Sequence, residues 1–312
     1  MGFPLTATRG PYDVGDGFGM DERPLTKTEI VTLLRAERLR PNRRRGQHFL
    51  IDGNLLRVIA DAPGLTDRDV VLEVGAGLGQ LTRLLAERAA HVVSVEIDAG
   101  FVRLLRRFLA DLHNVELIEA DILLKRRTIN PAVLDAVRRA RAAQPEAAWR
   151  VVSNPPYSVA TPFLIACLTG DPVPFDIHMT LQREVADRLA SAPGRKTYGL
   201  ATVLIQALAR VSVDRRVAAT TFWPRPAVDS ALVRIEPEPA LADRIRDFAT
   251  FRRVVAGLFQ ARRKALHNAL SRVADRDTAH RLLAETGLPA DRRPDALTVE
   301  DFIALANALT PT

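Results

Sequence analysis

The stretch Val71-Leu72-Glu73-Val74-Gly75-Ala76-Gly77-Leu78-Gly79 decides the fold of this chain. It begins as a mostly apolar run, typical of a buried parallel strand, and continues into glycines that let a backbone turn sharply and approach a ligand closely. A dinucleotide-binding loop requires the spacing G-x-G-x-x-G. Here the third glycine comes one position early, at Gly79, and Gln80 occupies the fingerprint position. The pattern therefore predicts a strand, a ligand-binding turn and a helix, and it disfavours NAD as the ligand.

Strand and helix patterns alternate on both sides of this turn. Apolar runs at 70–74, 91–96, 115–119, 150–153 and 177–181 predict strands, and patterns of period 3.6 predict helices at 78–88, 99–109 and 131–143. Such alternation implies right-handed crossovers and a parallel sheet. Residues 211–217 and 231–235 fit an antiparallel pair that closes the sheet. The expected fold class is α/β, with a Rossmann-like sheet that is parallel except for an antiparallel edge pair.

Carboxylates stand at the ends of three expected strands. Glu73 precedes the first glycine, Glu96 ends the second strand, and Asp121 follows the third. One such residue is more often a helix N-cap, but three in order fit a ligand at the carboxyl edge of the sheet. An acidic residue before G-x-G-x-G resembles the first motif of class I S-adenosylmethionine-dependent methyltransferases. In that fold the turn at Gly75 and Gly77 wraps the methionine part of the cofactor. Glu96 can then accept from the ribose hydroxyls, and Asp121 from the adenine amine.

Asn154-Pro155-Pro156-Tyr157, directly behind the strand expected at 150–153, is the second chemical motif. Two prolines fix φ and remove two backbone donors, so the loop presents carbonyl acceptors beside an amide and an aromatic ring. A stiff turn with a packed tyrosine is the structural alternative. Behind a methyltransferase cofactor site, the motif resembles enzymes that methylate a planar amine, either adenine N6 or a glutamine amide. If the Asn154 oxygen and the Pro155 carbonyl accept the amine hydrogens, the lone pair turns toward the methyl group, and Tyr157 can stack on the base.

Composition and charge restrict the partners. The 312 residues include 44 Lys and Arg against 37 Asp and Glu, which gives a net charge of +7. The pI of about 10.2 favours polyanions, so nucleic acid is an expected partner. The single cysteine, Cys167, excludes an internal disulfide and fits a reducing cytoplasm. The chain has no apolar run of roughly 18 residues, and its histidines lack ligand spacing. We therefore expect a cytoplasmic monomer with no membrane span and no metal.

Four segments are expected along the chain. Residues 1–23, rich in Gly, Pro and Asp, are expected to form a disordered extension. Residues 24–45 are expected to form an N-terminal helix and a basic linker, with Thr26 and Glu29 as a capping box and Pro41 ending the helix. Residues 46–238 would be the methyltransferase domain. Residues 239–312 carry only helical patterns, at 251–259, 265–273, 278–285 and 299–309, and predict a small all-α domain.

A further motif makes the resemblance specific. Gly46-Gln47-His48-Phe49-Leu50, together with the motifs above, resembles the ribosomal RNA adenine dimethyltransferases, in particular the KsgA/RsmA type that acts on the small subunit. The resemblance covers about residues 24–310 and continues through the segments 181–189, 196–199, 222–230 and 259–264. So many motifs in order make coincidence negligible.

The resemblance implies a role for each matching residue. The activity would be transfer of methyl groups from S-adenosyl-L-methionine to N6 of two adjacent adenosines, in a hairpin near the 3′ end of 16S rRNA. Asn154, Pro155 and Tyr157 would lie at the transfer point, and Phe222 would form the second wall of the base pocket. The basic run Arg262-Arg263-Lys264, on a helix of the C-terminal RNA- and ribosome-binding domain, would contact phosphates. The residues implied to contact the cofactor are Gln47, His48, Leu50, Gly75, Gly77, Glu96, Asp121 and Asn154.

Pro156 departs from the family pattern, which usually has leucine at that position, so that N-P-P-Y also resembles DNA adenine and glutamine methyltransferases. We expect the departure to be tolerated, because the functional carbonyl belongs to Pro155. The alternatives that stay open are an Erm-type 23S rRNA dimethyltransferase, a mainly non-catalytic ribosome-assembly factor and a DNA methyltransferase. The segments 228–230 and 260–264 favour the small subunit, and the intact Gly75 and Asn154 argue against a dead site.

Overall fold

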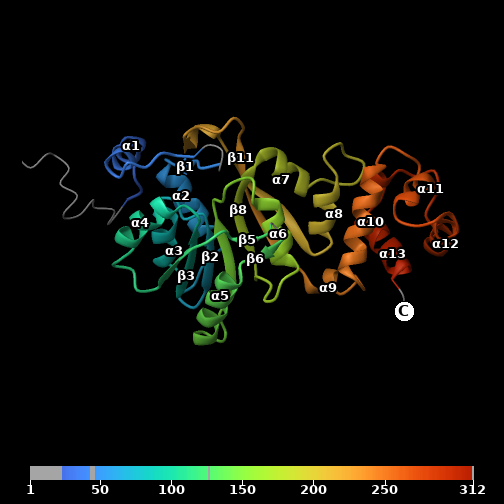
Figure 1. Ribbon diagram of the computed structural model, residues 1–312, viewed down its shortest axis with the longest axis horizontal. Helices are drawn as coiled ribbons and strands as arrows, with labels where there is room; N and C mark the ends of the chain where they lie inside the picture. The colour runs from blue at the N-terminus through green and yellow to red at the C-terminus, as the bar shows by residue number, and fades with distance from the viewer. Residues whose placement is uncertain (1–22, 43–45, 126, 311–312) are drawn as a thin grey trace, which may run out of the picture.

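The structure is a computed structural model that describes residues 23–42, 46–125 and 127–310. Its centre is a seven-stranded sheet with the order β4-β3-β2-β7-β8-β11-β9 (Figure 1). These strands are β2 (Val70–Val74), β3 (His91–Glu96), β4 (Val115–Glu119), β7 (Trp149–Ser153), β8 (Ile177–Gln182), β9 (Ala209–Val217) and β11 (Ser230–Pro237). The run from β4 to β8 is parallel, and β11 is antiparallel to both β8 and β9. The expected α/β class with an antiparallel edge pair is confirmed.

Helices cover both faces of the sheet. Alternate residues of β2 enter different apolar clusters, Val71 on one face and Val70 and Leu72 on the other. The helices of the Val71 cluster are α2 (Gly53–Asp61) and α3 (Gln80–Ala86), and those of the other cluster include α5 (Pro131–Ala143) and α6 (Ala160–Leu168). Further helices are α4 (Ala99–Phe108), α7 (Arg183–Leu189) and α8 (Leu200–Gln206). Burial on both faces explains why β2 has no polar and apolar alternation.

The N-terminal helix α1 (Lys27–Ala36) begins as the sequence predicts and ends earlier. Thr26 and Glu29 form the expected capping box. Pro41 does not end the helix, because the chain leaves it at Ala36 and Arg38 adopts a positive φ of 55°. The Leu39 amide then closes the turn on the Leu34 carbonyl at 2.8 Å. The expected extension at 1–23, apart from Arg23, and residues 43–45 of the basic linker lie outside the described residues.

Two short antiparallel pairs were not predicted. β1 (Phe49–Leu50) pairs with β10 (Phe222–Trp223), and β5 (Leu123–Leu124) pairs with β6 (Thr128–Ile129). Strands of two residues are too short to show a period. The first pair matters for the site, because it joins two segments that are far apart in the sequence.

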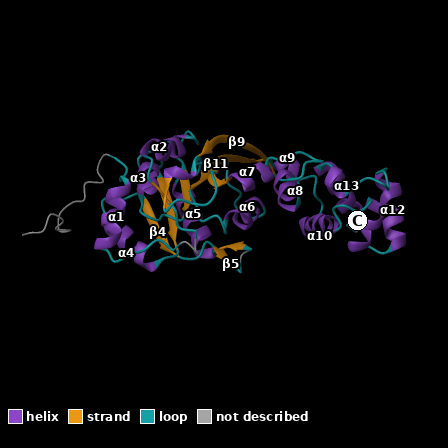
Figure 2. Ribbon diagram, turned by 90° about the horizontal axis from the view of Figure 1, so that it is seen from above, coloured by secondary structure: helices purple, strands orange, loops and turns teal. Residues whose placement is uncertain are grey.

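The C-terminal part is helical and lies at one end of the molecule (Figure 2). Its helices are α9 (Pro239–Ala242), α10 (Phe248–Gln260), α11 (Leu266–Ala269), α12 (Arg276–Thr286) and α13 (Val299–Leu309), with a 3₁₀ turn η3 (Leu270–Arg272) where a single helix at 265–273 was expected. The core of this part includes Val203 and Leu204 of α8, packed in one cluster with α10 and α13. Because the helical core reaches across residue 238, the domain division expected there stays a prediction.

Candidate active site

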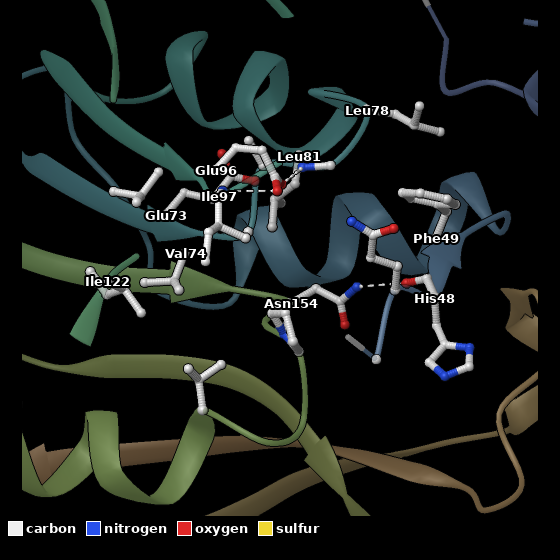
Figure 3. A pocket seen from close by; sticks show the side chains of 18 of the residues that line it. His48, Phe49, Glu73, Val74, Leu78, Leu81, Glu96, Ile97, Ile122 and Asn154 are labelled. Atoms are coloured by element: carbon white, nitrogen blue, oxygen red, sulfur yellow. Dashed lines mark hydrogen bonds between the residues drawn. The ribbon is translucent and has the colours of Figure 1, made fainter. Parts of the chain in front are cut away.

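A cavity lies at the carboxyl ends of the parallel strands, where the segment 46–50 crosses them (Figure 3). Its lining draws on the ends of β2, β3 and β7, the loop after β4 and the start of α6. All eight residues implied to contact the cofactor line this cavity, namely Gln47, His48, Leu50, Gly75, Gly77, Glu96, Asp121 and Asn154. Segments more than a hundred residues apart in sequence therefore meet around one space.

The glycine turn is closely packed at the positions where side chains would point. Gly75 has a φ of 82° and Gly79 has a φ of 75°, and residues other than glycine rarely adopt this backbone conformation. A Cβ on Gly79 would lie 2.8 Å from Leu105 Cδ2, and one on Gly75 would lie 3.1 Å from Pro156 Cδ. The Gly75 amide is held on the Val95 carbonyl at 2.8 Å, which fixes the turn on β3. The turn therefore keeps its backbone exposed to the cavity without side chains in the way.

Glu96 is a buried carboxylate at the end of β3, with 5% of its surface exposed. Its Oε2 accepts from the Gly77 amide at 3.0 Å, and its Oε1 accepts from the amides of Ile97 and Asp98 at 2.9 Å each. Burial raises the pKa of Glu96, while these backbone donors lower it and the nearby Asp98 raises it further. The backbone contacts fix the direction of the carboxylate, as a ligand for paired hydroxyls requires.

Glu73 is a second buried carboxyl in the cavity, and no role was predicted for it beyond its place in the motif. Its Oε2 accepts from the Thr82 hydroxyl at 2.5 Å and from the Ser94 hydroxyl at 2.8 Å. Burial raises the pKa of Glu73 to about 7, against the two hydroxyl donors and with a further increase from Glu96. The acid therefore titrates near neutral pH, which a carboxyl in water does not.

Asp121 is the third carboxylate that lines the cavity. One of its carboxylate oxygens accepts from the Leu123 amide at 3.0 Å, and its carbonyl accepts from Asn130 Nδ2 at 3.1 Å. Beside it, Ile97 is 48% exposed, whereas Ile122 is buried. Ile97 and Asp121 line the same cavity, so they offer an apolar face and a fixed acceptor, which suit the face and the edge of a purine.

Asn154 lies where β7 ends, and both ends of its amide have partners. Nδ2 donates to the His48 carbonyl at 3.5 Å, and Oδ1 accepts from the Thr180 hydroxyl (Figure 3). A carbonyl only accepts, so the atom facing His48 is the NH2 group and the oxygen faces Thr180. Ser153 fixes the strand end, because its hydroxyl donates to the Val74 carbonyl at 2.7 Å.

Tyr157 stands beside the cavity and is absent from its lining. Its ring stacks on that of His48, with ring centroids 6.0 Å apart and an angle of 27° between the planes. The Tyr157 hydroxyl lies 2.6 Å from Ser230 Oγ, and His48 Nδ1 lies 2.6 Å from the Pro224 carbonyl. Two aromatic rings, one of them from a residue that lines the cavity, are thus held against each other.

Phe222 does not form the wall that the sequence led us to expect. It is 2% exposed and packs in a hydrophobic cluster with Leu50 and Leu232. Its partner across the β1–β10 pair is Leu50. This pairing turns the ring into the core, and such a placement does not support the predicted role of Phe222 as a wall of the base pocket.

Arg262 is also placed differently from the prediction. It lies after the end of α10, not on a helix, and its side chain is used inside the protein. Nε donates to Asp295 at 3.1 Å, and the two terminal nitrogens donate to the carbonyls of Lys196 and Arg195 at 2.9 Å each. The adjacent residues 263 and 264 are exposed. Arg262 therefore joins the C-terminal part to the loop at 195–197, and only its neighbours remain open to solvent.

The described part of the chain holds no group of three or more His, Cys, Asp or Glu side chains placed to bind a metal ion. Within the same residues, no helix is both long and apolar enough to cross a membrane.

Comparison with known proteins identifies the relatives of this site. The family model described as ribosomal RNA adenine dimethylase matches residues 38–310. The chain belongs to this family. Among curated members, it is 39% identical over 272 residues to ribosomal RNA small subunit methyltransferase A of Rubrobacter xylanophilus, covering 87% of this chain and 96% of that one. Identity to the protein of the same name from Geobacter metallireducens is 36% over 281 residues, with 88% and 98% covered.

Solved structures related to the adenine dimethylase family share the fold. A dimethyladenosine transferase from Plasmodium falciparum aligns with a TM-score of 0.66 and 21% identity, over 82% of this chain and 95% of that one. The 23S rRNA methyltransferase ErmE aligns with a TM-score of 0.58 and 25% identity, and the alignment covers 84% of this chain and 99% of that one. The resemblance to an rRNA adenine dimethyltransferase family and the class I fold are thereby confirmed.

Sequence reasoning did not assign two polar residues of this family member's site. Thr180 is fully buried in β8 and contacts the Asn154 amide, and Ser230 is buried and contacts the Tyr157 hydroxyl. Thr180 lies in the strand expected at 177–181, and Ser230 directly precedes the strand expected at 231–235. A small polar residue beside apolar ones was the only available signal. A buried hydroxyl needs a hydrogen-bond partner, so such positions are worth testing against nearby motifs.

Proposed function

We propose that the protein transfers methyl groups from S-adenosyl-L-methionine to N6 of two adjacent adenosines in a hairpin near the 3′ end of 16S rRNA, giving N6,N6-dimethyladenosine. The observation that carries the proposal is that Glu96, Asp121 and Asn154 line one cavity. Family membership and the curated relatives named small subunit methyltransferase A support the choice of RNA.

The cavity fits the proposed cofactor part by part. Glu96 offers a carboxylate, held by three amides, to the ribose hydroxyls. Asp121 and the exposed face of Ile97 suit the adenine, and the backbone at Gly75 gives room for the methionine part. When bound, the cofactor supplies an electrophilic methyl group on a sulfonium. The protein's task is then mainly to position the amine in line with that methyl.

The transfer end of the cavity addresses the weak nucleophilicity of adenine N6, whose lone pair is delocalised into the ring. Asn154 Oδ1 and the Pro155 carbonyl would accept one N6 hydrogen each, which makes the nitrogen more tetrahedral and frees the lone pair. Tyr157 would hold the base by stacking, an interaction worth about 1–3 kcal/mol. The base must leave its own stack to reach this point.

The C-terminal part, residues 239–312, is proposed to bind ribosomal RNA. The chain is basic overall, and residues 263 and 264 are exposed beside the Arg262 contact. Exposed cations bind phosphates with little sequence preference, so they would orient the RNA and leave the choice of base to the cavity.

Methyl transfer to small subunits tests the proposal. Purified protein should bind S-adenosylmethionine and label small subunits from a strain that lacks this methylation. Asn154→Ala should reduce the labelling rate at least a hundredfold and change the cofactor Kd less than threefold, because the amide acts on the amine. Asn54→Ala, at an exposed position in α2, is the matched control and should label normally. Equal labelling by the Asn154 variant would remove the amide from the mechanism. Absence of labelling by the wild type would instead favour a binding factor.

A large-subunit substrate is the alternative that a specific observation favours, because ErmE shares the fold. Primer extension on rRNA from a strain lacking this protein separates the two. We expect the lost modifications near the 3′ end of 16S rRNA. Loss confined to 23S rRNA would overturn the small-subunit assignment.

A further inference from the structure

We propose that the imidazole of His48 forms the second aromatic face of the slot that receives the target adenine, opposite Tyr157. The inference rests on the proposed function and assigns the wall that Phe222 does not provide. The two rings are 27° from parallel, with centroids 6.0 Å apart. A base held between two rings needs a separation of about 7 Å, twice the ~3.4 Å between stacked bases. The pair must therefore widen before a base can lie between the two rings.

The ring pair lies at the transfer point. The backbone carbonyl of His48 accepts from the Asn154 amide, and Tyr157 follows Asn154 by three residues in the proline-stiffened loop. Figure 3 shows the His48 ring directed away from Glu96. His48 thus lines the cavity while its ring faces Tyr157.

One short segment anchors both rings. The Pro224 carbonyl lies 2.6 Å from His48 Nδ1, and because a carbonyl only accepts, Nδ1 carries the hydrogen. Ser230, which is fully buried, holds the Tyr157 hydroxyl at 2.6 Å. The residues from 224 to 230 therefore set the spacing of the rings. Rings held in place before binding lose little conformational freedom when a base enters.

Kinetics on undermethylated small subunits test the slot. His48→Ala should lower kcat/KM for the subunit at least tenfold, while the Kd for S-adenosylmethionine stays within threefold of the wild type. His48→Phe keeps a flat ring without the Pro224 hydrogen bond and should recover most of the loss. His113→Ala, at an exposed position in the turn before β4, is the matched control and should behave as the wild type.

The outcomes separate the inference from the function beneath it. Wild-type kcat/KM in His48→Ala, or a loss in His48→Phe as large as in the alanine variant, would overturn the stacking role. A His48→Ala variant whose cofactor Kd rises in proportion to the loss in kcat/KM would assign the ring to the cofactor instead, and that too overturns the slot. Failure of the wild-type enzyme to label small subunits would remove the proposed function itself.

Discussion

Pro156 occupies the space between two glycines. A Cβ on Gly75 would lie 3.1 Å from Cδ of Pro156, and a Cβ on Gly46 would lie 3.6 Å from Cβ of Pro156. The second proline of the loop therefore packs between the glycine turn and the segment 46–50, which crosses the cavity. This contact gives a physical reason for a compact, rigid side chain at the position that departs from the family pattern. Its carbonyl accepts from the Val159 amide at 3.1 Å, which shapes the turn into α6.

The buried Glu73 makes stability depend on pH. Its pKa is raised from 4.5 to about 7, so the folded state binds its proton more tightly than the unfolded chain. The stabilisation is complete below about pH 4.5 and is lost as pH rises through about 7. We expect wild type to lose about 3 kcal/mol from this group between these limits. Urea denaturation of wild type and Glu73→Gln at pH 5 and pH 8 measures the difference.

The glutamine variant is the control for every other titrating group, since it keeps the acceptor for Thr82 and Ser94 and removes only the titration. The wild-type stability should therefore fall relative to the variant as pH rises. Parallel curves for the two proteins would show that Glu73 stays ionised throughout. A bound cationic cofactor favours the carboxylate, so saturating S-adenosylmethionine should reduce the difference.

Residue types and strand ends could be predicted, whereas side-chain directions could not. Glu96 ends one strand of the expected parallel sheet, and Asp121 and Asn154 follow two others. Because the carboxyl ends of parallel strands share one edge, a site at that edge could be expected from the sequence. Phe222 has an equally clear motif, yet the direction of its ring depends on pairing with Leu50, more than 170 residues earlier. No local pattern reports a partner at that distance.

At the level of elements, the β1–β10 pair holds the segment 46–50, called the strap from here on, over the cavity. Gln80, which breaks the dinucleotide fingerprint, supports the same segment, because its Nε2 donates to the Leu50 carbonyl at 3.3 Å and its Oε1 accepts from the Leu25 amide at 2.5 Å. The main strands and helices could be predicted from their periods. This strap could not, because it depends on two residues of pairing and one buried amide.

Loss of the Phe222 ring should weaken the strap and the core together. Phe222→Ala leaves a cavity in the cluster around Leu50, and we expect a cost of about 3–5 kcal/mol in the free energy of unfolding. Thermal melting with and without S-adenosylmethionine measures it. The cofactor Kd should rise as well, because β1 carries part of the cavity lining. Phe222→Leu, which keeps most of the apolar volume, is the control, and an undiminished melting temperature for the alanine variant would contradict the buried placement.

Across the whole molecule, Arg262 joins the helical end to the sheet-containing part. Asp295 takes part twice, accepting from the Arg262 side chain and, through its carbonyl, from the Gly194 amide at 2.7 Å. The contact could not be predicted, because a basic run in sequence resembles a phosphate site whether its members face solvent or a neighbouring loop. Phosphate binding stays a prediction for its neighbours Arg263 and Lys264, since both are exposed.

Two arginine variants distinguish the contact from a phosphate site. Arg262→Ala should lower the free energy of unfolding by about 1–3 kcal/mol, because charged hydrogen bonds are lost. Arg263→Ala should leave stability unchanged and reduce the salt dependence of binding to small subunits by roughly one phosphate contact. Denaturation and binding over a salt series measure both. A normal melting temperature for Arg262→Ala, together with a reduced salt slope, would return Arg262 to the RNA surface.

The same contact has a geometric consequence for substrate choice. Because Arg262 fixes the loop at 195–197 against the C-terminal part, folding rather than RNA sets the span from Asn154 to the exposed cations at 263 and 264. The folded protein then presents Asn154 and these cations at a set distance from each other. If Arg263 and Lys264 bind phosphates as proposed, we expect an adenosine to be accepted only when the RNA backbone spans this distance. An identical hairpin in a differently shaped RNA should then not be methylated.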